Sequence, residues 1–121
     1  MQLYFNLSKN KPYNAPSFLS GNPTHVDELS QAIIDLLENS QFGTYHVVGS
    51  SSINRYDWAI KFCDLLGLDK NLLSDIKQPP KGIVPRPFNS NLNTNKLENK
   101  IGYKLSNVNE GLAKFKKEID I

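Results

Sequence analysis

The chain has 121 residues, of which 39% are hydrophobic and 21% are charged, and its formal net charge at pH 7 is +2. This length predicts one domain with a modest core. No apolar run approaches the roughly 20 residues of a membrane-spanning helix, and the N-terminus lacks the basic-then-apolar layout of a signal peptide. We therefore expect a cytoplasmic protein with no membrane partner.

The charge distribution and the single cysteine argue against a nucleic-acid-binding, a disulfide-bonded or a zinc-binding protein. Residues 1–68 carry four Lys/Arg against six Asp/Glu, whereas residues 69–121 carry ten against six. The late lysines are interleaved with acidic residues, which favours a solvated helical surface over a nucleic-acid-binding face. The single cysteine, Cys63, has no partner for a disulfide or a zinc site, and its helical, apolar neighbourhood predicts a core position.

The first 23 residues predict a short element followed by extended chain. Leu3, Phe5 and Leu7 fit a short helix or a strand, and we favour the end of a helix. Residues 11–16 contain two prolines, which disfavour helix and predict an extended segment. A turn is then expected at residues 21–23, Gly-Asn-Pro.

A long amphipathic helix is predicted next, from a cap at Thr24 to about Asn39. Asp27 and Glu28 suit the positive end of such a helix. Its apolar residues recur at three- and four-residue steps, namely Val26, Leu29, Ile33, Leu36 and Leu37. Residues 43–49 then predict a largely buried strand, Thr-Tyr-His-Val-Val between two glycines, with His46 as a hydrogen-bonded core or interface side chain.

The rest of the chain alternates helices with irregular segments. Asn54 is predicted to cap a helix that stops at Gly67, and residues 68–76 predict a helical turn followed by a strand. Residues 79–87 hold four prolines and predict an irregular loop. Two further helices are expected, one capped by Thr94 or Asn95 and closed by Gly102, and one opened by Ser106 or Asn107. The expected fold is a small mixed α/β lobe over residues 1–121, with about four helices and a few short strands.

Patterns that encode catalysis are missing from the sequence. It has no glycine-rich dinucleotide fingerprint and no phosphate loop, so we expect the chain itself to bind no cofactor. Tyr56 and Lys61 are five residues apart, whereas short-chain dehydrogenases use a spacing of four. His25 and His46 lack a third ligand at metal spacing, and we favour a structural role for both. We therefore predict no catalytic and no metal-binding residues.

A recognition surface is the stronger prediction. Arg86 offers a planar set of donors that suits phosphate. The neutral donors and acceptors that sugars and bases need are added by Asn89, Ser90, Asn91 and Asn93. Pro23 and Thr24 either contact the same ligand or only start the helix. Taken without a family, a polar loop with prolines is more often simply a loop.

Several motifs, in order, resemble the C-terminal, sugar-nucleotide-binding part of dTDP-4-dehydrorhamnose reductases. They are Asn-Lys-Pro at 10–12, the Gly-Asn-Pro-Thr-His-Val-Asp-Glu-Leu run at 21–29, residues 43–49, Arg-Tyr-Asp-Trp-Ala at 55–59, Arg-Pro-Phe-Asn-Ser-Asn-Leu-Asn-Thr-Asn-Lys-Leu at 86–97, and Gly-Leu at 111–112. These enzymes are extended short-chain dehydrogenases with an N-terminal Rossmann domain for NADPH or NADH. The resemblance implies that Arg86, Asn89 and Ser90 lie near a nucleotide-sugar cleft, and that the Rossmann domain, a partner of this lobe, is absent from this chain.

Two alternatives remain open at the level of sequence. The same C-terminal pattern is similar to the β subunit of methionine adenosyltransferase, a regulatory module, and to nucleotide-sugar epimerases. Without a Rossmann domain, apolar surface that normally packs against it should be exposed and invite self-association as a homodimer. The leading hypothesis is the substrate-binding portion of an NADPH-dependent reductase of dTDP-rhamnose biosynthesis.

Overall fold

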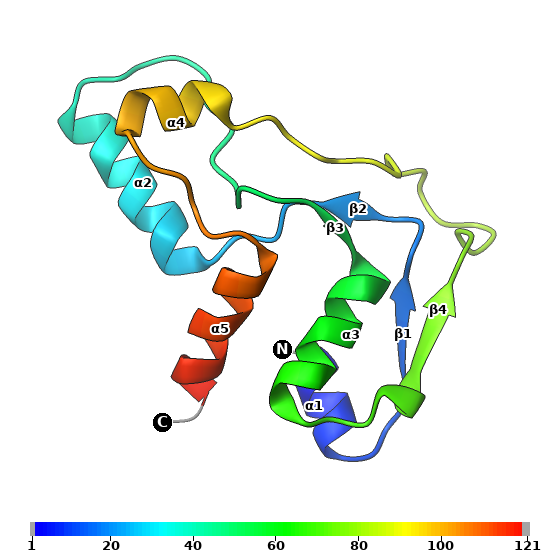
Figure 1. Cartoon of the computed structure of the whole chain (residues 1–121). Coiled ribbons are helices and arrows are strands. Elements are labelled where there is room, and N and C mark those ends of the chain that lie inside the picture. Colours follow the sequence, from blue (N-terminus) through cyan, green and yellow to red (C-terminus); the bar gives the residue numbers. More distant parts are fainter. Residues whose placement is uncertain (1, 120–121) are drawn as a thin grey trace. The chain divides into compact units, whose positions relative to one another are not determined.

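The computed structural model describes residues 2–119, which fold into two compact units. Unit 1 comprises residues 2–21 and 53–90, and unit 2 comprises residues 22–52 and 91–119. Five α-helices and four short strands are present in the described residues, which confirms the mixed α/β class and adds one helix to the expected number. Figure 1 shows these elements in chain order.

Unit 1 contains two helices, a 3-10 turn and all four strands. They are α1 (Gln2–Ser8), β1 (Tyr13–Pro16), β2 (Ser20–Gly21), β3 (Ile53–Asn54), α3 (Arg55–Leu66), the 3-10 turn η1 (Lys70–Leu72) and β4 (Leu73–Ile76). The helix at residues 2–8 and the extended segment before Pro16 are therefore confirmed. The turn and strand expected within residues 68–76 are confirmed as well.

Two short sheets organise unit 1. β1 and β4 pair in parallel, with Tyr13 opposite Leu73 and Pro16 opposite Ile76, while β2 and β3 pair antiparallel. A proline is tolerated at Pro16 because it lies at the end of a two-stranded sheet, where its missing N–H breaks no continuing ladder. Helix α3 packs against β1 and β4 (Figure 1).

Local sequence signals define both ends of α3. The Asn54 side chain accepts a hydrogen bond from the Asp57 backbone N–H at 2.8 Å, as the capping pattern predicts. Gly67 ends the helix with φ = 68°, a left-handed conformation in which glycine has no Cβ to clash. Cys63 is fully buried, which confirms its predicted core position, and burial raises the pKa of its thiol.

Unit 2 contains the helices α2 (Val26–Glu38), α4 (Asn95–Ile101) and α5 (Val108–Ile119). Its core is a cluster of Ala32, Leu36, Leu97 and Leu105, on which Tyr45, Val47 and Ile101 pack. Thr94 and Gly102 bound α4 as expected, and the Asn107 side chain accepts from the Glu110 N–H at 2.9 Å at the start of α5. Helices α2 and α4 contact each other within this unit (Figure 1).

The strand predicted at residues 43–49 does not form, and this prediction is wrong. Strand structure needs a neighbour that pairs with the backbone. Within residues 2–119, no backbone–backbone hydrogen bond involves residues 45–48. His46 is exposed rather than buried, and its Nδ1 lies 3.2 Å from the Asn93 carbonyl oxygen.

The start and the apolar stripe of α2 also differ from the prediction. The N-cap is His25, without a capping side-chain bond, and not Thr24. Of the predicted stripe only Leu36 is buried, while Val26, Ile33 and Leu37 are 65%, 44% and 61% exposed. The three- and four-residue periodicity correctly predicts a helix. It does not predict which apolar residues face the core of unit 2, because Ala32 and Leu36 are buried while Val26, Ile33 and Leu37 are exposed.

Candidate functional site

A cavity of about 760 Å³ lies in unit 1, between the end of the parallel strand pair and the proline-rich loop. Its wall is mostly apolar and includes Pro16, Phe18, Ile76, Ile83, Val84 and Phe88. The volume falls within the roughly 300–1,000 Å³ range of small-molecule sites. The cavity is therefore large enough for a ligand of nucleotide size.

Arg86 is the charged residue of this cavity wall. It is exposed, and no hydrogen bond or ion pair joins its guanidinium to any of the described residues. Residues 76–97 contain no Asp or Glu, whereas Lys77, Lys81 and Arg86 fall within the first eleven of them. The cavity thus presents an unpaired cation in a segment free of carboxylates, an arrangement that suits an anionic ligand.

The chain after Arg86 is held in place by backbone contacts with β2. The Ser20 N–H donates to the Phe88 carbonyl at 2.8 Å, and the Ser90 N–H donates to the Ser20 carbonyl at 2.9 Å. Ser20 and Asn89 form an isolated parallel bridge. Asn89 and Ser90 therefore directly follow the cavity wall, although they do not line the cavity themselves.

Pro23 and Thr24 belong to unit 2, where they meet Gly49. The Thr24 hydroxyl donates to the Asn22 carbonyl and accepts from the Gly49 N–H, both at 3.0 Å. A Cβ added to Gly49 would lie 2.1 Å from the Pro23 carbonyl oxygen, so only glycine fits there. These contacts give Pro23 and Thr24 a structural role, and contact with substrate stays a prediction.

A carboxylate joins the helices of unit 2. Glu28 Oε1 accepts from the Ser106 N–H at 3.0 Å and from its hydroxyl at 2.9 Å, and lies 3.1 Å from Lys114 Nζ. Burial alone would raise the pKa of Glu28, but the bonds from Ser106 and the charge of Lys114 outweigh it and lower the pKa below its ordinary value. Glu28 is therefore a structural anion that ties α2 to the start of α5.

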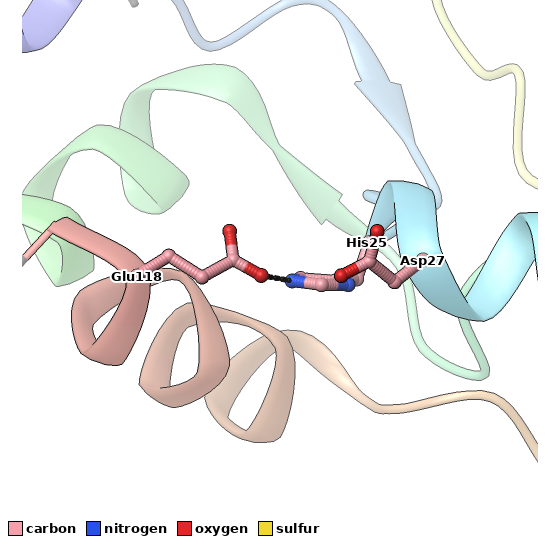
Figure 2. A group of neighbouring side chains, drawn as sticks. All are labelled: His25, Asp27 and Glu118. Carbon is pink, nitrogen blue, oxygen red and sulfur yellow. Dashed lines mark hydrogen bonds and ion pairs between the residues drawn. The ribbon is translucent and has the colours of Figure 1, made fainter.

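Figure 2 shows a second cluster in unit 2, formed by His25, Asp27 and Glu118. His25 Nε2 lies 2.8 Å from Glu118 Oε1, and the His25 side chain is only 9% exposed. One nitrogen or oxygen from each residue lies within 4.8 Å of the others, a donor set that zinc or another divalent ion accepts. The sequence offered no signal for this cluster because Glu118 is 93 residues from His25.

The predicted site residues fall into two groups. Arg86, Asn89 and Ser90 lie together in unit 1, whereas Pro23 and Thr24 lie in unit 2. Sequence reasoning missed the aromatic part of the cavity, Phe18 and Phe88, whose rings are 5.5 Å apart. Only the alternation of prolines and apolar residues at 79–88 could have drawn attention to Phe88, and no such signal surrounds Phe18.

Solved structures define the class of this fold. The chain superposes on dTDP-4-dehydrorhamnose reductase from Bacillus anthracis, solved in complex with NADP, with a TM-score of 0.85 and 25% identity, covering 97% of this chain and 42% of that one. A dTDP-4-dehydrorhamnose reductase ortholog from Clostridium acetobutylicum gives a TM-score of 0.85 at 21% identity, covering 99% and 43%. The mixed α/β fold is thus a segment of the fold of these reductases.

Sequence comparison places the chain in a family. Residues 6–121 match the RmlD substrate binding domain, and the chain belongs to that family. The methionine adenosyltransferase 2 subunit beta of Xenopus laevis is 32% identical over 94 residues, which are 74% of this chain and 28% of the relative. The chain therefore spans less than half the length of these relatives.

Proposed function

We propose that this chain is the nucleotide-sugar-binding part of a nicotinamide-dependent reductase that acts on the 4-keto group of a dTDP-linked deoxysugar. The unpaired guanidinium of Arg86 in an apolar cavity is the observation that carries this proposal. Membership of the RmlD substrate binding domain family and the similarity to dTDP-4-dehydrorhamnose reductases support it.

In this proposal Arg86 binds the diphosphate and Asn89 and Ser90 approach the sugar. A planar guanidinium donates two parallel hydrogen bonds to phosphate, which fixes orientation as well as position. Holding the substrate in one orientation lowers the barrier to a reaction at the keto carbon, because rotational freedom is already lost on binding. The chain's contribution is therefore the placement of the sugar.

The described residues do not fit a nicotinamide cofactor. Their strands are two or four residues long, and none leads through a glycine-rich turn into a helix. NADPH or NADH would therefore be held by another part of the full-length protein. Within residues 2–119, no helix is long and apolar enough to cross a bilayer.

The direct test is titration of the protein at its native length with dTDP. We expect Arg86→Gln to weaken binding about 10- to 100-fold, because a charge-assisted contact contributes roughly 1.5–3 kcal/mol. Lys81→Gln is the matched control, since Lys81 does not line the cavity, and should change affinity less than about threefold. Equal affinities for the wild type and Arg86→Gln would contradict the proposal.

A non-catalytic regulatory module is the second candidate, favoured by the similarity to methionine adenosyltransferase 2 subunit beta. In that case the Arg86 surface contacts a protein. Oxidation of NADPH by the native-length protein with dTDP-4-dehydrorhamnose supports the reductase. Unchanged dTDP binding by Arg86→Gln, together with loss of a co-purifying protein, supports the regulatory module.

A further inference from the structure

We propose that Phe88 is the platform on which the base of a nucleoside diphosphate stacks, beside the phosphate-binding guanidinium of Arg86. This inference rests on the proposed function and adds the residue that recognises the base. Three properties of Phe88 support it: its exposure, its fixed backbone and its position in the cavity.

Phe88 is exposed but anchored. Phe88 is 57% exposed. Aromatic surface that stays in contact with water adds nothing to the free energy of folding, so folding alone does not account for a phenylalanine at this position. The Ser20 N–H holds the Phe88 carbonyl, and the Ser20 carbonyl holds the N–H of Ser90 two residues on. Because the backbone is pinned on both sides of the ring, a ligand that stacks on it orders little additional chain.

The neighbouring Phe18 ring packs against Phe88 without stacking on it in parallel. Phe18 and Phe88 meet at 5.5 Å between ring centroids with an interplanar angle of 68°. Such an edge-to-face contact is favourable, but it does not cover both rings as a parallel stack would. An open aromatic face is what a nucleobase uses, since every base presents a flat π-surface.

Arg86 and Phe88 line the same cavity two residues apart along the chain. A ligand that satisfies both must carry an anionic group and a flat ring. The absence of Asp and Glu from residues 76–97 removes the charges that would repel phosphates. A nucleoside diphosphate combines these groups, whereas a sugar phosphate has no flat aromatic ring and a free base has no negative charge.

The test compares variants of Phe88 with Arg86→Gln on the native-length protein, using dTDP and inorganic pyrophosphate as probes. We expect Phe88→Leu to weaken dTDP binding about tenfold, since base stacking on an aromatic side chain accounts for such factors, and Phe88→Tyr to restore it. Inorganic pyrophosphate, which has no base, should compete with dTDP equally well in the wild type and in Phe88→Leu. Phe42→Leu is the matched control, because Phe42 is 78% exposed but lies in unit 2.

The outcomes test the base platform and the proposed function separately. Weaker dTDP binding by both Arg86→Gln and Phe88→Leu, with pyrophosphate affected only by Arg86→Gln, supports the platform. Full dTDP affinity in Phe88→Leu overturns the platform but leaves the proposed function standing if Arg86→Gln still weakens binding. Failure of the wild type to bind dTDP overturns both. A Phe88→Leu protein that binds pyrophosphate normally is folded, so misfolding is excluded as the cause.

Discussion

The polar side chains around Glu28 in unit 2 and the Arg86 side chain in unit 1 have different surroundings. In unit 2, Glu28, His25 and Thr24 are joined to other residues of the unit by side-chain hydrogen bonds or ion pairs. In unit 1, the guanidinium of Arg86 lines an apolar cavity with no such partner among the described residues. The difference separates polar residues that stabilise the fold from one that is available to a ligand.

The same difference separates two kinds of effect on mutation. Changes in the unit 2 network should lower the free energy of unfolding. Changes at Arg86 should lower ligand affinity and leave that free energy intact. Five measurements break or sharpen this comparison.

Gly49→Ala should have the largest effect on stability. Its new Cβ would lie 2.1 Å from the Pro23 carbonyl oxygen, which is backbone and cannot rotate away. We expect a loss of about 2–3 kcal/mol, measured by urea unfolding, because overpacking forces the surrounding chain to shift. Gly21→Ala is the control, since nothing lies within 4 Å of its Cβ position, and it should cost less than about 0.5 kcal/mol.

Glu28→Ala should lower stability by about 2 kcal/mol. It removes the acceptor of both Ser106 donors and leaves the buried Ser106 N–H unsatisfied. Because the folded-state pKa of Glu28 is lowered, its contribution is complete above the ordinary pKa of 4.5 and is lost as pH falls through the folded-state value. The difference from wild type should therefore shrink in acid. Glu38→Ala, at an exposed helix end, should change little at any pH.

Asn54→Ala should cost about 1 kcal/mol. The variant loses the side-chain acceptor of the Asp57 N–H at the start of α3. Thermal unfolding followed by circular dichroism measures the loss. Asn54→Ser should retain most of the stability, since serine also caps helices and places no second carboxylate beside Asp57. An unchanged melting temperature in Asn54→Ala would show that packing alone defines this helix end.

Tyr103→Phe should change the alkaline stability profile. Burial, together with a hydrogen bond to Asp35 and the charge of that carboxylate, raises the pKa of Tyr103 to about 12. A raised folded-state pKa means that the tyrosine's contribution is complete below pH 10 and is lost as pH rises towards 12. The phenylalanine variant should therefore lose less stability than the wild type over this range. Identical pH profiles would show that the contact with Asp35 does not stabilise the fold.

Arg86→Gln should have the smallest effect on stability, within about 0.5 kcal/mol. Its side chain is exposed and makes no contact that folding requires in the described part of the chain. Urea unfolding beside Gly49→Ala gives the contrast directly. A loss of more than about 1 kcal/mol would mean that Arg86 is structural, and its contrast with the polar residues around Glu28 would fail.

Local patterns in the sequence predicted most elements correctly. The caps at Asn54 and at Gly67 are both present in the structure. Each cap depends only on residues within four positions of the capping residue. The strand at 43–49 failed because pairing depends on a distant neighbour that the pattern does not contain. Family resemblance was confirmed over residues 6–121, from motifs that are each weak but occur in a fixed order.

The sequence predicts residues of the candidate site, but it does not predict the cavity in which Arg86 lies. Arg86 was identified from its chemistry and its place in a proline-rich loop. The cavity around it requires β1 and β4 to pair, and these strands are about sixty residues apart in sequence. Likewise the carboxylate of Glu118 reaches His25 only once α5 has packed. Because the two residues are 93 positions apart, residue spacing could not predict that they form a cluster.

The most direct test is to follow the backbone amide signals of the isotope-labelled, native-length protein by NMR during titration with dTDP. The cavity in unit 1 should respond most, with the largest shifts at the amides of the non-proline residues within 83–90 and saturation at the same dTDP concentration for all of them. Arg86→Gln should need a higher concentration to reach the same shifts. Largest shifts among the residues around Glu28 and Ser106, or no shifts at all, would contradict the assignment of ligand binding to the Arg86 cavity.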